Sequence, residues 1–376
     1  MKVFTNDDAT SKSFLLPFVS ETFSENINPI ISEAINSSRA VLSARGGNIR
    51  SDGGATLEVT TESEALNHLF AHLLGKGGGA GFDAYPATAP FPNVIAIVAA
   101  VSLVRGTYYS VNGGRYLCVK PTTTALSLGD ITDFVSLQEG DGDLPCGTGL
   151  LQYYGAMAVI PKRMVVRGAK HLPVKPLEFF KTFEVANEDI NIKFEGVKVN
   201  SVEISVPQEG IVTANFAALG SVSSPINGSN VPTADADNYG DGYTGYECVV
   251  LSETVTGAVQ TATISISNEL DGDVWKLGSR YRHDIVAQRR SNSGNVVLYL
   301  ENLDAYNAFK DETTFELKFF FAYKGRYLEI DFPAAKFLGG SPTPQIGGNG
   351  VITVPVDFQT MMDATKGYDV QISRVI

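Results

Sequence analysis

Apolar and polar residues alternate with a period of two in several short segments of this chain. The clearest is 201–220, where Val202, Ile204 and Val206 alternate with serine and glutamate and a turn follows at 207–210. A period of two places apolar side chains on one sheet face and polar side chains on the other. The turn holds a proline, which fixes φ, and a glycine, which tolerates positive φ. The segment is therefore predicted to be an antiparallel hairpin with one buried face.

Helical periodicity is confined to two short segments. Residues 61–74 carry one apolar stripe, Thr61 and Glu64 have the spacing of a capping box, and Gly75 can adopt the left-handed C-terminal turn. In residues 303–310 an asparagine precedes the helix, and three residues share an apolar face: Leu303, Tyr306 and Phe309. Short runs rich in Thr, Val, Gly and aromatic residues fill the rest, which predicts an all-β chain with few helices.

Three blocks of sequence carry a resemblance to a known family. Residues 31–75 place arginines among small residues and end in HLLG, and residues 194–220 read FEGVKVNSVEISVPQEGIVTANFAALG. Residues 261–375 contain TATISISNELDG, LGSRY, NVVLYLE, LDAYNAFKD, FPAAKFLGGSPTP and VITVPVDFQ in that order. Taken together, the blocks resemble the tail tube proteins of long-tailed bacteriophages.

The resemblance implies the tail tube fold, in which two packed antiparallel sheets form a β-sandwich or half-barrel flanked by a helix. It implies a structural protein of the virion tail, made in the host cytoplasm, and neither an enzyme nor a cofactor carrier. Hexameric rings of the chain would stack into a tube that conducts DNA during ejection. The expected partners are further copies of the chain, other tail proteins at the tube ends, and DNA in passing. A tail terminator or a secretion-system tube remains an alternative.

The chain departs from the family pattern after its first helix, where related proteins have a shorter connection. We expect three parts: 1–83 as the N-terminal part of the tube domain, 84–165 as an inserted surface β module, and 166–376 as the remainder. A hairpin signal at Asn112-Gly113 lies within the insert, between alternating aromatic and apolar residues. This pattern faintly resembles small carbohydrate-binding modules, so a carbohydrate-binding adhesin is the second alternative, although tyrosines packed in a small core explain the insert more simply.

Charge is distributed unevenly along the chain. The formal net charge is −12, and residues 178–260, which include the hairpin, hold 12 acidic and 3 basic residues. A protein that grips DNA needs Lys and Arg to displace phosphate counterions, so this segment suits a wall along which DNA slides. Acidic charge that merely keeps the protein dispersed is the plainer explanation.

Motifs of metal or membrane sites are weak. The three cysteines have no paired spacing, and the run 268–273 has oxygen ligands without the rest of an EF-hand, so a β-turn is favoured there. His68 and His72 are four residues apart without the glutamate of a zinc motif, which favours a helix surface or an interface. The longest apolar run, 94–104, is shorter than the ~20 residues that span a bilayer. No cofactor, metal or membrane span is expected.

Two sets of residues are predicted to act in the assembled tube. The polar faces of 201–215 and 261–267 are expected to line the lumen, through Glu203, Ser205, Thr213, Asn215, Thr263 and Ser265. A basic stretch at 162–175 and an acidic loop at 221–246 are expected to order against each other between subunits. The residues proposed for this contact are Lys162, Arg163, Arg167, Lys170, Asp235, Asp237 and Asp241.

Overall fold

The computed structural model describes most of the chain. The described residues are 2–7, 12–33, 43–75, 83–84, 95–96, 108–111, 114–118, 151–153, 163–168, 174–185, 189–233, 239–252, 258–323, 326–339, 342–346 and 351–375. Within them β-strands dominate, accompanied by two α-helices and two short 3₁₀ helices, Gly228–Asn230 and Gly245–Glu247. The all-β prediction is therefore confirmed. None of the helices described is long and apolar enough to cross a membrane.

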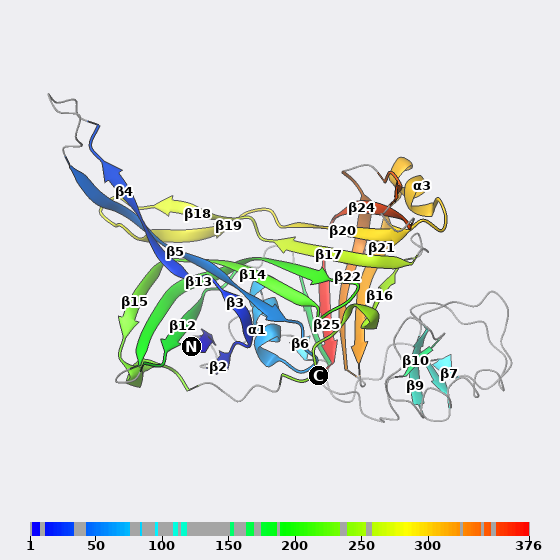
Figure 1. Ribbon diagram of the computed structural model, residues 1–376, viewed down its shortest axis with the longest axis horizontal. Helices are drawn as coiled ribbons and strands as arrows, with labels where there is room; N and C mark the ends of the chain where they lie inside the picture. Colours follow the sequence, from blue (N-terminus) through cyan, green and yellow to red (C-terminus); the bar gives the residue numbers. More distant parts are fainter. Residues whose placement is uncertain are drawn as a thin grey trace.

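Six strands lie side by side in one broad layer (Figure 1). Their order is β5 (Ala44–Glu58), β14 (Thr213–Gly220), β13 (Ile190–Val206), β17 (Val259–Ser267), β20 (Ser291–Tyr299) and β24 (Ile352–Thr360). Each strand is antiparallel to the next. β13 and β14 are the predicted hairpin, and Gly210 in its turn has φ +114. That prediction is confirmed.

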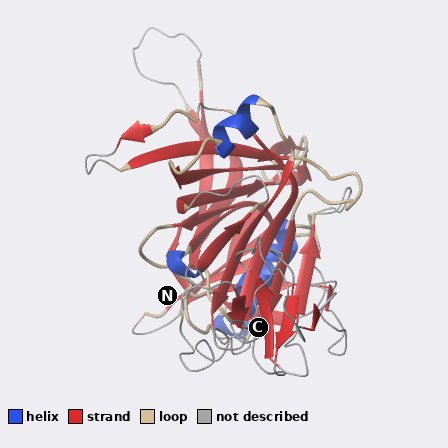
Figure 2. Ribbon diagram, turned by 90° about the vertical axis from the view of Figure 1, so that its right-hand side faces the viewer, coloured by secondary structure: helices blue, strands red, loops and turns tan. Residues whose placement is uncertain are grey.

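A second layer packs against the first. It contains β16 (Cys248–Leu251), β21 (Phe315–Tyr323), β22 (Arg326–Phe337), β25 (Gln371–Val375), β11 (Arg163–Arg167) and β6 (Asp83–Ala84), all antiparallel. The end of β22 also pairs with β24, so the two layers form one continuous, curved sheet. Figure 2 shows the strands curving past α1. The structure thus confirms the prediction of packed antiparallel sheets flanked by a helix.

Further strands pair with the first half of the long strand β13. There β12 (Leu177–Phe183) and β15 (Val222–Ile226) flank it, β1 (Lys2–Asp7) pairs with β12, and β2 (Lys12–Leu15) pairs with β1. β15 corrects the prediction that 221–246 is one long loop. Its backbone pairs with β13 despite the polar composition, because the strand ladder satisfies backbone groups whatever the side chains are.

Helix α1 (Glu64–Leu73) begins later than predicted. The Oγ of Ser63, not of Thr61, accepts the hydrogen bond that caps the helix, from the backbone N–H of Leu66 at 3.1 Å. Thr61 is held outside the helix because its N–H and its Oγ1 both bond to the backbone of Asp241. The end is as predicted, with Gly75 at φ +79.

His72 corrects a second expectation for this helix. Its side chain is 0% exposed, and its Nδ1 lies 3.2 Å from the carbonyl oxygen of Lys175. His68 packs its ring edge-on against that of His72, with 4.5 Å between the ring centroids. His72 is therefore part of the buried packing of α1, and His68 is half-buried beside it.

Strand β25 was not predicted, and it is fixed to α1 by a buried arginine. Arg374 is 0% exposed and donates hydrogen bonds to the carbonyl oxygens of Thr60 and Ser63, at 2.5 and 3.1 Å, and to Oδ1 of Asn67. Thr60 lies just before the helix, and Ser63 is its N-cap residue. β25, which lies between β22 and β11, thereby attaches the second layer to the start of α1.

Helix α3 (Asp304–Lys310) is located as predicted but packs differently. Ala305 and Ala308 are its buried residues, whereas Leu303 is 61% exposed and Tyr306 is 46% exposed. Only Phe309 of the predicted apolar face packs against the core. The helix therefore rests on its small residues and turns two large apolar side chains outward.

Two ribbons form a projection at one end of the molecule (Figure 1). β4 (Ser24–Ile31) pairs with the first part of β5, while β3 (Phe18–Glu21) pairs with its last part. The second ribbon consists of β18 (Leu270–Trp275) and β19 (Arg282–Ala287). Arg282 of β19 binds both carboxylate oxygens of Asp52 on β5. We call residues 24–31 with 44–52 the arm.

A separate small sheet lies within the predicted insert. It contains β7 (Ile95–Ala96), β8 (Tyr108–Val111), β9 (Gly114–Cys118) and β10 (Leu151–Tyr153). β8 and β9 form the hairpin predicted around Asn112-Gly113. The strands that precede and follow this sheet, β6 and β11, pair with each other in the main sheet. The described part of β23 (Gln345–Ile346) pairs with β24.

Candidate functional site

The alternation in β13 separates an apolar face from a polar one. Val202, Ile204 and Val206 are buried, whereas Glu203 and Ser205 between them are exposed. The same division continues across the neighbouring strands because antiparallel pairing places residues of one face directly opposite each other. The result is a polar surface that extends over all six strands of the first layer.

The register arranges this surface in three rows, which together we call the polar face. The first row runs Thr56, Asn215, Glu203, Ser265, Ser293 and Gln359, from β5 to β24. The second runs Glu58, Thr213, Ser205, Thr263, Asn295 and Asp357. The third contains only small residues: Gly54, Ala217, Ser201, Ser267 and Ser291. All six residues predicted to line the lumen thus lie next to one another in the first two rows.

An apolar layer holds the polar face in place from behind. Directly under it lie Ile204, Ala214, Ile264, Val296 and Val356, each at most 2% exposed. Gly294 is needed in this layer, because a Cβ there would lie 2.2 Å from the carbonyl oxygen of Thr263 and 2.5 Å from the ring of Phe358. The close packing gives the polar face a fixed, sheet-like shape.

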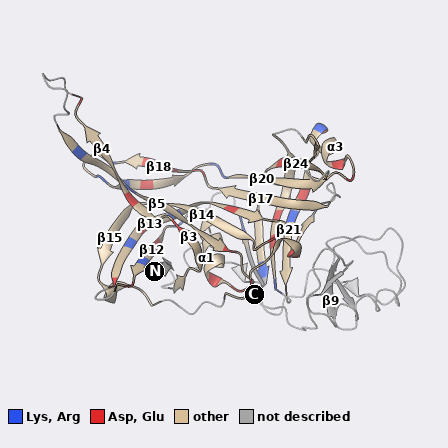
Figure 3. Cartoon of the chain, viewed as in Figure 1, with Lys and Arg blue, Asp and Glu red and all other residues tan. Residues whose placement is uncertain are grey.

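The chemistry of the polar face is that of hydroxyls, amides and carboxylates. Its three charged residues, Glu58, Glu203 and Asp357, are all acidic. Figure 3 shows no Lys or Arg on β14 or β17. Lys336 pairs with Gln359 at the margin, where its Nζ lies 3.9 Å from a carboxylate oxygen of Glu312. A phosphate group over the three rows would meet carboxylates and hydroxyls without a cation to hold it.

Two hydrogen bonds order the ends of the rows. Asn295 donates from Nδ2 to Oδ1 of Asp357 at 2.7 Å, and Thr56 donates from Oγ1 to Oδ1 of Asn215 at 3.3 Å. Such cross-strand pairs fix the side chains on the surface of the sheet. One carboxylate, two amides and one hydroxyl of the face thereby already have partners within the chain.

Half of the first two rows was missed by sequence reasoning. The missed residues are Thr56, Glu58, Ser293, Asn295, Asp357 and Gln359. The signal was the same alternation, since Ala55 and Leu57 are buried on either side of Thr56, and Val356 and Phe358 on either side of Asp357. Alternation alone could not assign these strands to the layer that contains β13, because strand order depends on long-range pairing.

Seven residues were predicted to join neighbouring subunits. Four of them lie outside the described residues, namely Lys162, Lys170, Asp235 and Asp237. Arg163 and Arg167 lie on β11. Arg167 donates from Nε to Oε1 of Gln371 at 2.6 Å, and its guanidinium lies 5.1 Å from the ring centre of Tyr368. Asp241 is exposed and bonds through its backbone to Thr61. The predicted contact between the basic stretch and the acidic loop of neighbouring subunits therefore stays a prediction.

The fold and the polar face together define a structural β protein with a broad polar sheet surface. The family described as phage tail tube protein matches residues 2–360, which is nearly the whole chain. The chain therefore belongs to the phage tail tube protein family, as the three sequence blocks predicted, and it is a structural protein of the virion tail. A comparison with curated protein sequences finds no match.

Proposed function

We propose that the chain forms hexameric rings that stack into the tail tube, and that the polar face lines the bore through which DNA passes. The observation that carries this proposal is the composition of the three rows. They combine small uncharged residues with three carboxylates and contain no Lys or Arg. DNA binds proteins chiefly through cations that replace phosphate counterions, so a surface of this composition lets DNA slide without holding it.

Ring formation gives the sheet edges a partner. An unpaired strand edge presents backbone groups that pair readily with another chain, and a closed assembly of identical subunits satisfies them. The six-strand layer itself keeps little open edge, because β3 and β4 pair with the outer side of β5 while β22 and β23 pair with the ends of β24. In the tube, the layers of neighbouring subunits would therefore lie next to one another as the wall of the bore. Other tail proteins would occupy the tube ends, after synthesis of the chain in the host cytoplasm.

The insert is proposed to lie on the outside of the tube. Asp83 pairs with Val165 and Ala84 with Met164, so the chain leaves and re-enters the main sheet at adjacent positions. Residues 84 and 163–165 pair with the main sheet, and the module that can be removed as a unit is 85–162. An insertion at such a point disturbs only a connection between paired strands.

Electron microscopy of the purified protein tests the proposal. We expect stacked rings of unlimited length with sixfold symmetry, in which the reconstructed density places Glu203 on the bore. Single rings that do not stack would instead indicate a tail terminator. Tubes in which the apolar side of β13 is nearer the axis would contradict the assignment of the polar face.

A further inference from the structure

The ribbon formed by β18 and β19 lies on the same side of the first layer as the polar face. Beyond the third row, the register places Asp52, Leu219 and Lys198 in a fourth row on that side. Arg282 of β19 binds both carboxylate oxygens of Asp52, and a Cβ built on Gly272 of β18 would lie 3.1 Å from Cδ1 of Leu219. The ribbon therefore covers the fourth row. We call residues 270–287 the strap.

Among the described residues, three ion pairs attach the strap to the strands beneath it. They are Asp52 with Arg282, Lys198 with Asp284, and Arg50 with Asp273. The last two pairs are open to solvent, because the side chains of Asp284 and Asp273 are 56% and 66% exposed. The side chain of Arg282, in contrast, is buried. Exposed pairs contribute little in water and are screened by salt, so this attachment is sensitive to ionic strength.

Apolar and backbone contacts add little to the attachment of the strap. β18 and β19 bury one apolar side chain, that of Ile285 near the root. The two strands form a sheet of their own, and the N–H of Ile49 donates a hydrogen bond across to the carbonyl oxygen of Arg280 at 2.8 Å. Water competes for ion pairs and hydrogen bonds, which lowers their net contribution. The strap is therefore held less firmly than the strands it covers.

The root of the strap has a strained backbone next to a fixed residue. Glu269, between β17 and β18, has φ +46, in the left-handed region that residues other than glycine rarely adopt. Asn268 before it is buried, and its Nδ2 donates hydrogen bonds to the carbonyl oxygens of Leu73 and Val199, at 2.7 and 3.2 Å. Hinges are residues at the ends of elements that absorb changes in φ and ψ. Glu269 is in such a position.

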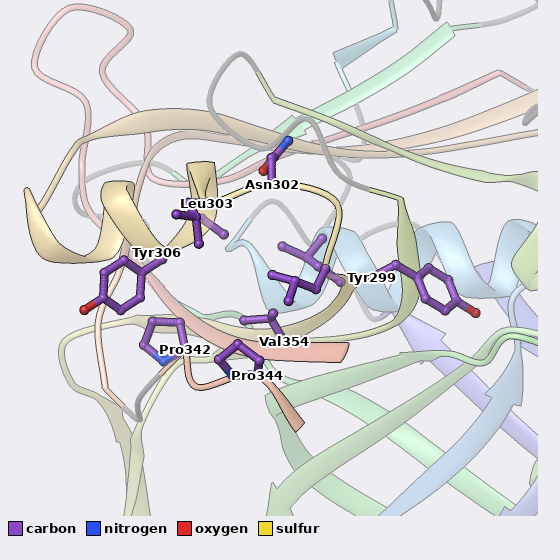
Figure 4. A pocket seen from close by; sticks show the side chains of 10 residues that line it. Tyr299, Asn302, Leu303, Tyr306, Pro342, Pro344 and Val354 are labelled. Atoms are coloured by element: carbon purple, nitrogen blue, oxygen red, sulfur yellow. The ribbon is translucent and has the colours of Figure 1, made fainter. Parts of the chain in front are cut away.

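Helix α3 is attached to the sheet in the opposite way. Its buried residues are Ala305 and Ala308. Figure 4 shows Leu303 at an apolar pocket of about 190 Å³ beside the helix, where Val354 of β24 is also a lining residue. Salt screens charges and leaves such apolar contacts in place. The helix is therefore an internal control for the effect of salt on the strap.

We propose that the strap is a latch that opens as a unit about Glu269 while the six strands stay folded, and that the three ion pairs hold it closed. Segments with few buried apolar contacts open locally at a lower free energy than the core. Opening uncovers the fourth row and separates the base of the arm from Arg280. The position of the latch beside the bore rests on the proposed function, whereas its opening in the monomer does not.

Hydrogen exchange on the monomer tests the latch. An isolated two-stranded hairpin is marginally stable in water, so the amides of 270–287 should exchange during opening, together with the Ile49 amide that bonds to the strap. We expect this exchange to be at least tenfold faster in about 1 M NaCl, where the Debye length falls to about 3 Å, than at low salt. The amides of β13, β17 and α3 should not change.

A variant opens the latch without added salt. Asp52→Asn leaves Arg282 without its anion and should accelerate exchange of the strap at least tenfold at low salt. Asp311→Asn, at an exposed carboxylate outside the strap and its ion pairs, is the matched control. Circular dichroism and the melting temperature verify the fold of both variants. The salt series on the natural protein still decides the matter where Asp52→Asn does not fold.

Trp275 gives a second measurement of the same opening. It is the only tryptophan of the chain, it is half-buried, and its ring centre lies 5.9 Å from the guanidinium of Arg50. Its emission should shift to the red over the same salt range as the exchange. Strap amides that exchange as slowly as those of β13 at both salt concentrations would overturn the latch. Equal acceleration in all six strands would also overturn it, since the strap would then not open as a unit.

Reconstructions of the tube separate the latch from the proposed function. A strap on the outer surface of the tube would contradict the assignment of the bore and leave the opening measured in the monomer intact. Exchange that does not depend on salt in the monomer, with the strap beside the bore in the tube, would overturn the latch and leave the proposed function intact.

Discussion

Glu203 on β13 lies directly opposite Ser265 of β17 on one side and Asn215 of β14 on the other. The carboxylate therefore occupies the middle of a row of uncharged polar residues, over a core in which Ile204 is fully buried. No residue in this row from Thr56 to Gln359 carries a positive charge. This position makes Glu203 the most direct test of the polar face.

Replacing Glu203 with lysine should leave tubes intact but slow genome ejection by on the order of tenfold, because a ring of cations in the bore would bind phosphate. The measurement is the rate of DNA release from purified virions. Glu203→Gln, which adds no cation, should eject nearly as fast as the natural protein. Glu209→Lys, in the exposed turn outside the three rows, is the matched control. Normal ejection with the lysine shown to face the bore would refute the sliding argument.

Deleting residues 85–162 should give tubes that are narrower but still assemble. Ala84 and Met164 are already paired across β6 and β11, so an Asn-Gly turn can join the two strands. Electron microscopy of the deleted and intact proteins compares the tube diameters. A deleted protein that stays monomeric where the intact one polymerises would place the insert in the assembly interface.

Reversing the charge of Asp235, Asp237 and Asp241 with lysine should impair ring stacking and leave the subunit folded. Thr61 bonds to the backbone of Asp241, which the substitution retains. High ionic strength should slow tube growth in the same way, because salt screens exposed charges. Light scattering follows growth, and hydrogen exchange on monomer and tube locates the contact. If neither 162–175 nor 221–246 gains protection on assembly, the pairing of these segments is wrong.

The stabilising contribution of the buried Asp331 carboxyl to the monomer should decrease as the pH rises. Burial raises the pKa of its carboxyl to about 7, against the nearby Lys318, and Tyr368 donates a hydrogen bond to it at 3.0 Å. In the unfolded chain the pKa is about 4. Between these values the folded state binds more protons, so the contribution of Asp331 to stability is greatest below pH 4 and is lost as the pH rises from about 4 to 7.

Asp331→Asn removes this contribution. The loss in unfolding free energy between pH 5 and pH 8 should shrink by roughly 2 kcal/mol relative to the natural protein. Urea unfolding at both pH values, at concentrations that keep the protein monomeric, measures the difference. The exposed Asp311→Asn serves as the control. An unchanged pH dependence in Asp331→Asn would show that the buried carboxylate is already ionised at pH 5.

The sequence by itself determined what depends on near neighbours in the chain. Alternation in β13 and β17 assigned Glu203, Ser205, Thr263 and Ser265 to one face, because the period of two is a property of the extended backbone. The turn at Gly210 and the end of α1 at Gly75 were likewise predicted from residues close together in the chain. The arrangement of the blocks along the chain was sufficient to indicate the family.

Only the tertiary structure decided which strands lie side by side. Glu58 and Asp357 belong to one row although they are 299 positions apart in the chain, and long-range pairing of this kind leaves no local pattern. Arg374 and its strand were missed because a buried arginine is stable only where carbonyls from another element accept its hydrogen bonds. Leu303 and Tyr306 formed an apolar stripe in the sequence, but the structure buries Ala305 and Ala308 of α3 and exposes the two larger side chains. Their outward position depends on which side of the helix packs against the strands, and the stripe alone does not fix that side.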